Sequence, residues 1–148
     1  MAIAGLGTDL VELARIEKAL SRFEERLLAH ILHPAEQRLM PCSGKARTAF
    51  AASRFAVKEA AAKALGTGFA SGVVPTDIET ASLPSGAPIL RLHGAALRRA
   101  KALGVCACHL SITHSATHAM AVVILESNAV LQDELKEDME STSALNNE

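Results

Sequence analysis

The sequence predicts an α+β fold in which a mostly antiparallel sheet packs on a long central helix. Helical periodicity dominates residues 13–65, whereas strand patterns separated by turns dominate residues 73–126. An alanine-rich segment, residues 46–65, is the longest predicted helix and ends at Gly66. A run of helices followed by paired strands favours the α+β class.

Residues 3–9 are expected to form a short strand, and an amphipathic helix follows it. Apolar residues in that helix recur at alternating spacings of three and four, which is a helical period. They are Leu13, Ile16, Leu20, Phe23 and Leu27. Pro34 then suits the first turn of a short helix that extends to about Met40, before a loop at residues 41–44.

Four strands and one more helix are predicted in the second half. The strands are residues 73–80, 88–92, 107–112 and 119–126, and the helix is residues 94–103. The last strand contains the run AMAVVIL, so we expect it at the centre of the sheet. Residues 127–148 are polar and acidic and are expected to be a frayed helix or disordered, which leaves residues 1–126 as the one predicted domain.

Charge is divided unevenly along the chain. Residues 126–148 hold seven acidic residues and one basic residue, whereas residues 1–125 hold 9 acidic and 14 basic residues. The basic body suggests an anionic partner, such as a phosphate compound, a nucleic acid or an acidic protein. Aromatic residues make up only 3% of the chain, which argues against a nucleic-acid binder that stacks bases.

Compartment signals point to the cytoplasm. The N-terminal residues lack the basic and apolar regions of a signal peptide, and no run approaches the ~18 apolar residues of a membrane span. The three cysteines, Cys42, Cys106 and Cys108, are an odd number that suits a reducing compartment. We therefore expect a cytoplasmic protein without a membrane partner.

The long helix carries the first candidate site. Glu59 and Lys63 are four residues apart and share one face, while the opposite side carries apolar residues. Those are Phe50, Val57, Ala61 and Ala64. The two charged residues form either a surface ion pair, which stabilises a helix by about 0.2–0.5 kcal/mol, or part of a site that holds a metal beside a phosphate.

Asp9 has two interpretations that the residues alone leave open. Its carboxylate follows the first strand and precedes a helix, where it can cap the backbone at Val11 or Glu12. Alternatively, Asp9 and Glu59 converge. Two carboxylates with water and a substrate phosphate are a usual Mg²⁺ site, and Lys63 would lie beside the same phosphate.

Other motifs carry weaker signals. Gly5-Leu6-Gly7 lacks the third glycine of a dinucleotide fingerprint. Cys106 and Cys108 lack a second pair of zinc ligands, which favours buried strand cysteines. The segment from Ser111 through His114 to Ser115 has no nucleophile elbow and no nearby acid, so hydrolase chemistry is disfavoured. Its side chains remain candidate donors to phosphate oxygens.

Three blocks resemble the holo-(acyl-carrier-protein) synthases, the short-chain type of 4′-phosphopantetheinyl transferase. They are residues 7–12 (GTDLVE), 54–68 (RFAVKEAAAKALGTG) and 109–115 (HLSITHS), and the resemblance spans about residues 3–126. It implies magnesium-dependent transfer of phosphopantetheine from coenzyme A to a serine of apo acyl carrier protein, in fatty acid biosynthesis, with release of adenosine 3′,5′-bisphosphate. It also implies a homotrimer with active sites at subunit interfaces.

The resemblance implies roles for particular residues. Asp9 and Glu59 match the metal ligands, and Lys63 matches a lysine beside the pyrophosphate. The serine's base is expected to be Glu59 acting through a metal-bound water, with Asp9 as the second choice. The residues expected to bind coenzyme A are Lys45, Arg47, Arg54, Lys63, Gly86, Pro88, Ser111 and His114. The residues expected to dock the acidic carrier are Arg15, Arg22 and Arg26.

Two rival functions stay open. The first is a non-catalytic trimeric module that binds coenzyme A or the carrier protein and uses Asp9 and Glu59 only for structure. The second is a nucleic-acid binder that uses the basic face. The second is disfavoured by the scarcity of aromatic residues and by the glutamates interspersed on the first helix.

Overall fold

An antiparallel sheet in the order β1-β5-β4 forms one layer of the structure. The structure is a computed structural model that describes residues 1–128. In the sheet, β5 (His118–Ser127) lies between β1 (Ala2–Glu12) and β4 (Val105–His114). The central place expected for the apolar strand is confirmed. Side chains alternate along it, and Ala119, Ala121, Val123 and Leu125 are all 0% exposed.

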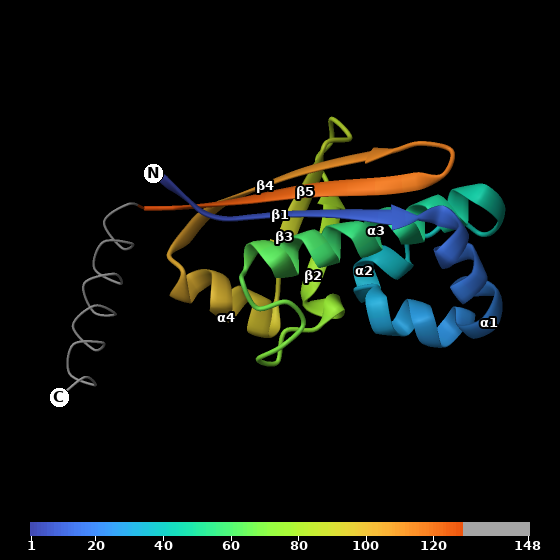
Figure 1. The fold of residues 1–148 in the computed structure, drawn as a ribbon, viewed down its shortest axis with the longest axis horizontal. Coiled ribbons are helices and arrows are strands. Elements are labelled where there is room, and N and C mark those ends of the chain that lie inside the picture. The colour runs from blue at the N-terminus through green and yellow to red at the C-terminus, as the bar shows by residue number, and fades with distance from the viewer. Residues whose placement is uncertain (129–148) are drawn as a thin grey trace.

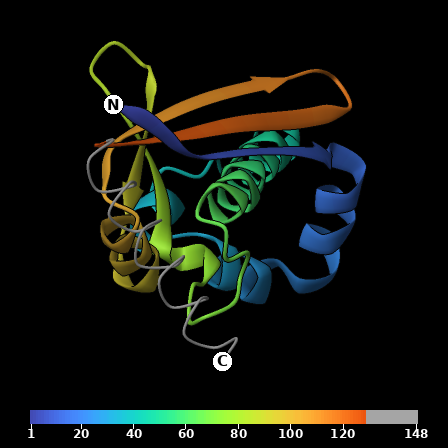
Figure 2. The same cartoon turned by 60° about the vertical axis from the view of Figure 1, so that its left-hand side comes forward.

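The helices lie on one side of this sheet, as Figures 1 and 2 show. They are α1 (Leu13–Ile31), α2 (Pro34–Gln37), α3 (Gly44–Ala64) and α4 (Gly94–Ala102). A second, two-stranded sheet is the antiparallel hairpin of β2 (Ile78–Ser82) and β3 (Pro88–Leu92). The α+β fold with antiparallel sheets packed on a long helix is therefore confirmed. None of the described helices is long and apolar enough to cross a membrane.

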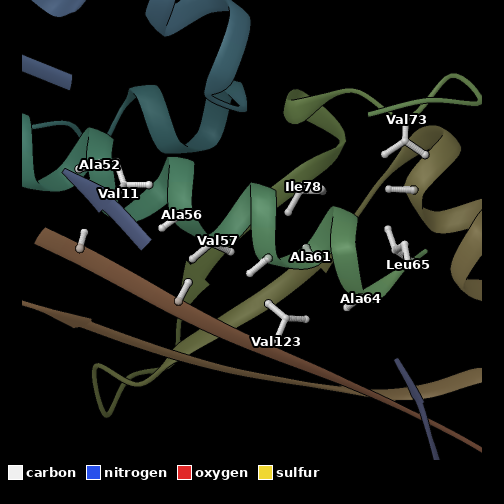
Figure 3. Packing of buried hydrophobic residues seen from close by; sticks show 14 of the residues in the cluster. Val11, Ala52, Ala56, Val57, Ala61, Ala64, Leu65, Val73, Ile78 and Val123 are labelled. Carbon is white, nitrogen blue, oxygen red and sulfur yellow. The ribbon is translucent and has the colours of Figure 1, made fainter. Parts of the chain in front are cut away.

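Small side chains let α3 pack against the sheet (Figure 3). Ala52, Ala56 and Ala60 are fully buried, and Val57 packs in the same cluster as Val123 of β5. The helix is buried on most of its sides, whereas the sequence predicted one charged face and one apolar face. Lys58 is 0% exposed. The sequence pattern of the helix does not distinguish this lysine from the charged residues that stay at the surface.

Gly5 and Gly7 allow β1 to approach α3 closely. A Cβ at Gly5 would overlap the carbonyl oxygen of Ala64, and a Cβ at Gly7 would overlap that of Ala60. Both overlaps are with helix backbone, which cannot rotate away as a side chain can. The glycine pair is therefore a site of close strand–helix packing.

We expect Gly7→Ala to lower the free energy of unfolding by about 2–3 kcal/mol, because overpacking against backbone forces β1 away from α3. Urea unfolding measures the change. Thr8→Ala is the matched control, because Thr8 is exposed on the same strand and should cost less than about 0.5 kcal/mol. Equal losses in the two variants would contradict the close-approach explanation.

Several predicted boundaries were wrong, for identifiable reasons. The first strand continues to Glu12 because Glu12 pairs with His118 of β5. The first helix bends at Phe23, whose backbone is non-helical, so Phe23 is 53% exposed and leaves the apolar stripe. The short helix ends at Gln37. Pro75 starts a 3₁₀ turn, because proline cannot donate to a strand ladder, and this delays β2 to Ile78.

The predicted acidic tail falls almost entirely outside the described residues, which end at residue 128. Ser127, which the sequence placed in the tail, is instead the last residue of β5 and is 0% exposed.

Candidate functional site

Asp9, Glu59 and Lys63 come together where β1 crosses α3. The ammonium of Lys63 donates to Asp9 Oδ1 at 3.0 Å and to the backbone oxygen of Thr8 at 2.9 Å. Asp9 lies inside β1, opposite Ala121 of β5, so its interpretation as a helix cap is wrong. The residue at the N-cap of α1 is Glu12. Lys63 pairs with the aspartate of the neighbouring strand.

The surroundings of Glu59 in this cluster shift the pKa of its carboxyl group. Burial raises the pKa of Glu59 above its ordinary value, the charge of Asp9 raises it further, and Lys63 opposes both effects. The largest cause is the loss of water around the carboxylate. A half-buried glutamate with a raised pKa is suited to accept a proton from a substrate near neutral pH.

A pocket of about 410 Å³ opens beside the two carboxylates. Asp9 and Glu59 line one part of it, Arg15 of α1 supplies a cation, and the rest is apolar. The apolar lining consists of Leu10, Val11, Ile16, Ala19, Leu27, Ile31 and Phe55. The arrangement can therefore hold a cation between the carboxylates at its charged end and an apolar group at the other end.

The chain's sequence matches the model of the 4′-phosphopantetheinyl transferase superfamily over residues 5–123. The chain belongs to this superfamily. Two curated relatives named holo-(acyl-carrier-protein) synthase support the assignment. The relative from Desulfovibrio desulfuricans is 54% identical over 125 residues, 84% of this chain and 98% of its own. The relative from Solidesulfovibrio magneticus is 56% identical over 124 residues, 84% of this chain and 98% of its own.

Solved structures of the transferase superfamily share the fold. A holo-(acyl-carrier-protein) synthase from Bacillus anthracis, in complex with coenzyme A (3′,5′-ADP), has a TM-score of 0.71 at 39% identity and covers 85% of this chain and 98% of its own. The enzyme of the same name from Neisseria meningitidis has a TM-score of 0.77 at 34% identity and covers 85% of this chain and 100% of its own.

The metal implied by membership of the transferase superfamily fits the pocket. Its ionisable lining is Asp9, Glu59 and Arg15, so the metal donors available there are carboxylate oxygens. Mg²⁺ prefers oxygen ligands and keeps several waters, so two carboxylates suffice. A bound cation would also relieve the repulsion between Asp9 and Glu59 that raises the pKa of Glu59.

Three basic residues expected to bind coenzyme A lie at different places along α3. Lys45 is exposed and lines a pocket of about 380 Å³ with Ser115 and Thr117 of the turn after β4. Arg47 is held by Glu24 at 2.6 Å and by the backbone oxygen of Pro41 at 2.8 Å. This places Lys45, more than Arg47, in a position to meet a ligand.

Arg54 is also constrained. Its guanidinium stacks 4.0 Å over the Phe50 ring. The Nε atom is buried and has no hydrogen-bond partner within residues 1–128. Burial lowers the pKa of Arg54, and the charge of Glu36 opposes this shift. Because this Nε atom is buried, the Arg54 side chain must move before a ligand can reach it.

The remaining coenzyme A candidates lie away from Asp9 and Glu59 within one chain. Gly86 is in the exposed β2–β3 turn and Pro88 begins β3. Ser111 and His114 are exposed on β4, on the far side of β5 from β1. None of these four described residues lines the pocket that contains Asp9 and Glu59. A single chain therefore does not bring them to the carboxylates.

The carrier-docking candidates are all exposed on α1. Arg15 lines the carboxylate pocket, so its charge acts on the site directly. Arg22 and Arg26 lie further along the helix, on either side of the bend at Phe23. The basic surface of α1 thus begins at the pocket rim.

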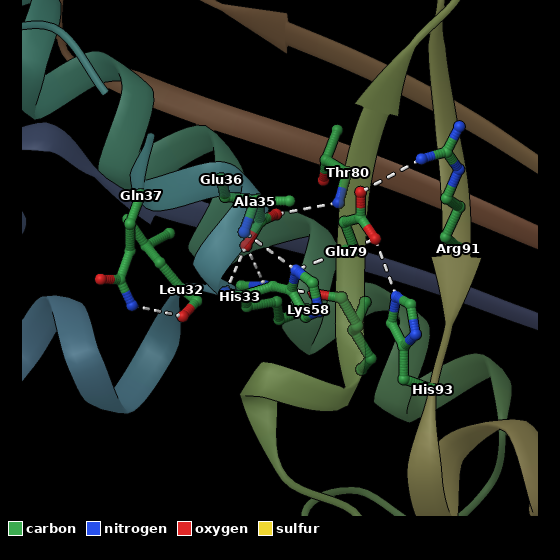
Figure 4. Close-up of polar contacts among 11 residues, drawn as sticks. Leu32, His33, Ala35, Glu36, Gln37, Lys58, Glu79, Thr80, Arg91 and His93 are labelled. Atoms are coloured by element: carbon green, nitrogen blue, oxygen red, sulfur yellow. Dashed lines mark hydrogen bonds and ion pairs between the residues drawn. The ribbon is translucent and has the colours of Figure 1, made fainter. Parts of the chain in front are cut away.

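Sequence reasoning missed a buried ion pair formed by Lys58, the residue before Glu59 on α3 (Figure 4). Lys58 donates to Glu36 Oε2 at 2.7 Å and to the backbone oxygen of Ile78, and both charged side chains are almost fully buried. The available signal was the spacing of His33 and Glu36. Glu36 accepts from the His33 backbone N–H, and the His33 ring accepts from Ala35 N–H, as in a capping box.

The expectation of buried cysteines on one strand face was wrong for Cys106. Cys106 is exposed, whereas Cys108 is half-buried. A register shift between Val105 and Ala107 interrupts the alternation of side chains on β4. Burial raises the pKa of the Cys108 thiol, with a further increase from Cys106.

Proposed function

We propose that the protein transfers 4′-phosphopantetheine from coenzyme A to a serine of an apo acyl carrier protein, with release of adenosine 3′,5′-bisphosphate, in fatty acid biosynthesis. The observation that carries this proposal is the meeting of Asp9, Glu59 and Lys63 beside one pocket. Relatives named holo-(acyl-carrier-protein) synthase at 54% identity support it. So does a similar structure described as a complex with coenzyme A.

The reaction makes one bond and breaks one. The serine oxygen attacks the phosphorus attached to pantetheine, and the bond from that phosphorus to the bridging oxygen breaks. Glu59 is the proposed base, because its raised pKa suits proton uptake, and Asp9 is the second choice. Lys63, aimed by Asp9 and Thr8, binds the pyrophosphate and stabilises the charge on the departing bisphosphate.

Asp9 and Glu59 would hold the metal ion in this proposal. When bound, Mg²⁺ supplies charge neutralisation and alignment of the pyrophosphate. Asp9 then has two tasks, since it also positions Lys63 at 3.0 Å. Lys45 and Arg54 are proposed to bind the 3′-phosphate of coenzyme A, and the support for Lys45 is its exposed position beside a pocket.

The proposed function is tested by incubating the protein with Mg²⁺, coenzyme A and an apo carrier protein, and weighing the carrier by mass spectrometry. We expect a phosphopantetheine adduct on the carrier serine that forms only with metal present. Binding of coenzyme A and carrier without an adduct would instead support the non-catalytic module.

We propose that the protein is a homotrimer with sites at subunit interfaces. The outer sheet face carries exposed apolar side chains: Ile3 at 65%, Leu6 at 61%, Leu10 at 64% and Met120 at 36%. An exposed apolar patch of this kind marks an association surface. A second copy would also supply β4 residues such as Ser111 to the pocket. Light scattering that gives the mass of one chain would reject this state.

The cytoplasm is the proposed compartment. Its support is the free state of Cys42, Cys106 and Cys108, which suits reducing surroundings.

We expect Arg22→Glu to raise KM for the carrier roughly tenfold, equal to about 1.4 kcal/mol, with KM for coenzyme A unchanged. Arg22 is exposed on α1 and does not line the carboxylate pocket, so its charge acts on an acidic partner. Steady-state kinetics at low and high salt measure both constants, and salt should shrink the difference.

Arg98→Glu is the matched control, because Arg98 is exposed on α4 and carries the same charge change. A similar rise in both variants would show a net-charge effect and reject docking on α1.

A further inference from the structure

Three side chains with metal-binding atoms meet between the start of α2 and the β2–β3 hairpin, away from the Asp9–Glu59 pocket. His33 is the N-cap residue before α2, Glu79 is on β2 and His93 links β3 to α4. Their ligand atoms all lie within 4.8 Å of one another. Figure 4 shows both imidazoles turned toward the Glu79 carboxylate. His93 Nε2 is 2.7 Å and His33 Nδ1 is 3.8 Å from Glu79 Oε2.

We propose that His33, Glu79 and His93 form a second metal site that binds a divalent transition-metal ion of the zinc class. Two imidazole nitrogens and one carboxylate oxygen are a donor set for Zn²⁺, Co²⁺ or Ni²⁺, whereas Mg²⁺ prefers oxygen alone. Three protein ligands leave the fourth tetrahedral position for water. This site does not depend on the proposed transferase function.

Metal binding at this site would require the two imidazole rings to change position. The two imidazoles stack with centroids 4.6 Å apart and planes 11° apart. His33 Nδ1, which lies 3.8 Å from Glu79 Oε2, already accepts the Ala35 N–H at 3.1 Å. Metal binding therefore requires that His33 gives up this hydrogen bond and that His93 rotates toward the shared ion. His93 has the most room to rotate, because its side chain is 42% exposed, against 24% for His33 and 7% for Glu79. The exposed side of His93 is also where the water ligand has room.

One cation competes for the same carboxylate. Arg91 Nη1 lies 3.4 Å from Glu79 Oε1 and its side chain is 57% exposed. A bound metal ion would take over part of the charge compensation that Arg91 now provides. Removal of Arg91 should therefore strengthen metal binding, which a purely structural ion-pair cluster does not predict.

The metal site would join three segments that are distant in the sequence. Two of them also contact Glu36, which binds Lys58 of α3. The His33 N–H donates to Glu36 at 2.8 Å, and the N–H of Thr80, next to Glu79, donates to the other Glu36 oxygen at 2.8 Å. Glu36 in turn holds Lys58, the neighbour of Glu59. A metal ion here would stabilise the fold by binding the native state alone.

The test titrates metal-free full-length protein with Zn²⁺ by calorimetry and with Co²⁺ by visible absorption, in excess Mg²⁺ and in a Glu59→Gln background. We expect one ion per chain, a tetrahedral Co²⁺ spectrum and a higher Tm with Zn²⁺. His93→Ala should weaken binding more than about tenfold, since loss of even a group that only supports a ligand weakens metal affinity about 10–100-fold. Arg91→Gln should strengthen it.

His109→Ala is the matched control. His109 also bonds one glutamate, Glu126, at 2.7 Å, but among residues 1–128 it belongs to no cluster of three metal-binding side chains. This variant should bind Zn²⁺ as the parent does. Absence of Zn²⁺ binding in the Glu59→Gln background, or equal affinity in His93→Ala and the parent, would overturn the proposed site.

Discussion

Glu59→Gln is expected to lower kcat for transfer to the carrier by at least about 100-fold. General acid–base catalysis alone contributes about 10²–10⁴-fold, and this variant also loses a proposed metal ligand. The substitution keeps the size of the side chain and removes the charge that faces Asp9. Rates of carrier modification in saturating coenzyme A and Mg²⁺ measure the loss. Full activity would reject the assignment of Glu59.

The same variant should fold at least as well as the parent. Burial and Asp9 raise the pKa of Glu59 above 4.5, so the folded protein binds the proton more tightly than the unfolded chain. Parent stability therefore falls as pH rises from about 4.5 through the raised pKa. Glu59→Gln lacks this loss, so the Tm difference between variant and parent should grow in its favour across that range.

Glu25→Gln is the matched control for activity. Glu25 is exposed on α1 and does not line the carboxylate pocket, so removal of its charge should leave transfer within about twofold of the parent rate. A large loss in this variant would show that glutamate charge in general, rather than Glu59, supports the rate.

Lys58→Met should lower the free energy of unfolding by about 3–5 kcal/mol, because it leaves a buried charge without its partner. Lys58 and Glu36 have side chains that are 0% and 1% exposed, and their charged atoms are 2.7 Å apart. Urea unfolding measures the loss. Lys63→Met, on the same helix but with a side chain that is 53% exposed, should cost less than about 1 kcal/mol.

The double variant Lys58→Met, Glu36→Gln measures how much of the stability comes from the interaction between these two residues, rather than from their contacts with other neighbours. A neutral amide in place of the Glu36 carboxylate no longer needs a buried counter-charge, so part of the loss should be recovered, with a coupling of at least about 1 kcal/mol. Strict additivity of the two single changes would mean that the ion pair contributes nothing beyond packing.

Several elements could be predicted because their signals are local. The stop at Gly66 follows from a residue that accepts positive φ, here 74°. The central place of β5 follows from a run with apolar residues on both faces. The end of β1 could not be predicted, because pairing of Glu12 with His118 extends the strand past its polar residues. The bend at Phe23 likewise breaks a period that the sequence continues.

The sequence by itself determined the spacing of Glu59 and Lys63 on one helix face and the family to which the chain belongs. Only the tertiary structure decided that Lys63 bonds to Asp9, a residue 54 positions away, and that Lys58 is buried against Glu36. Helical spacing is fixed by short-range backbone geometry. Strand register, close approach at glycine and burial of charge depend on contacts between distant segments, which no local pattern encodes.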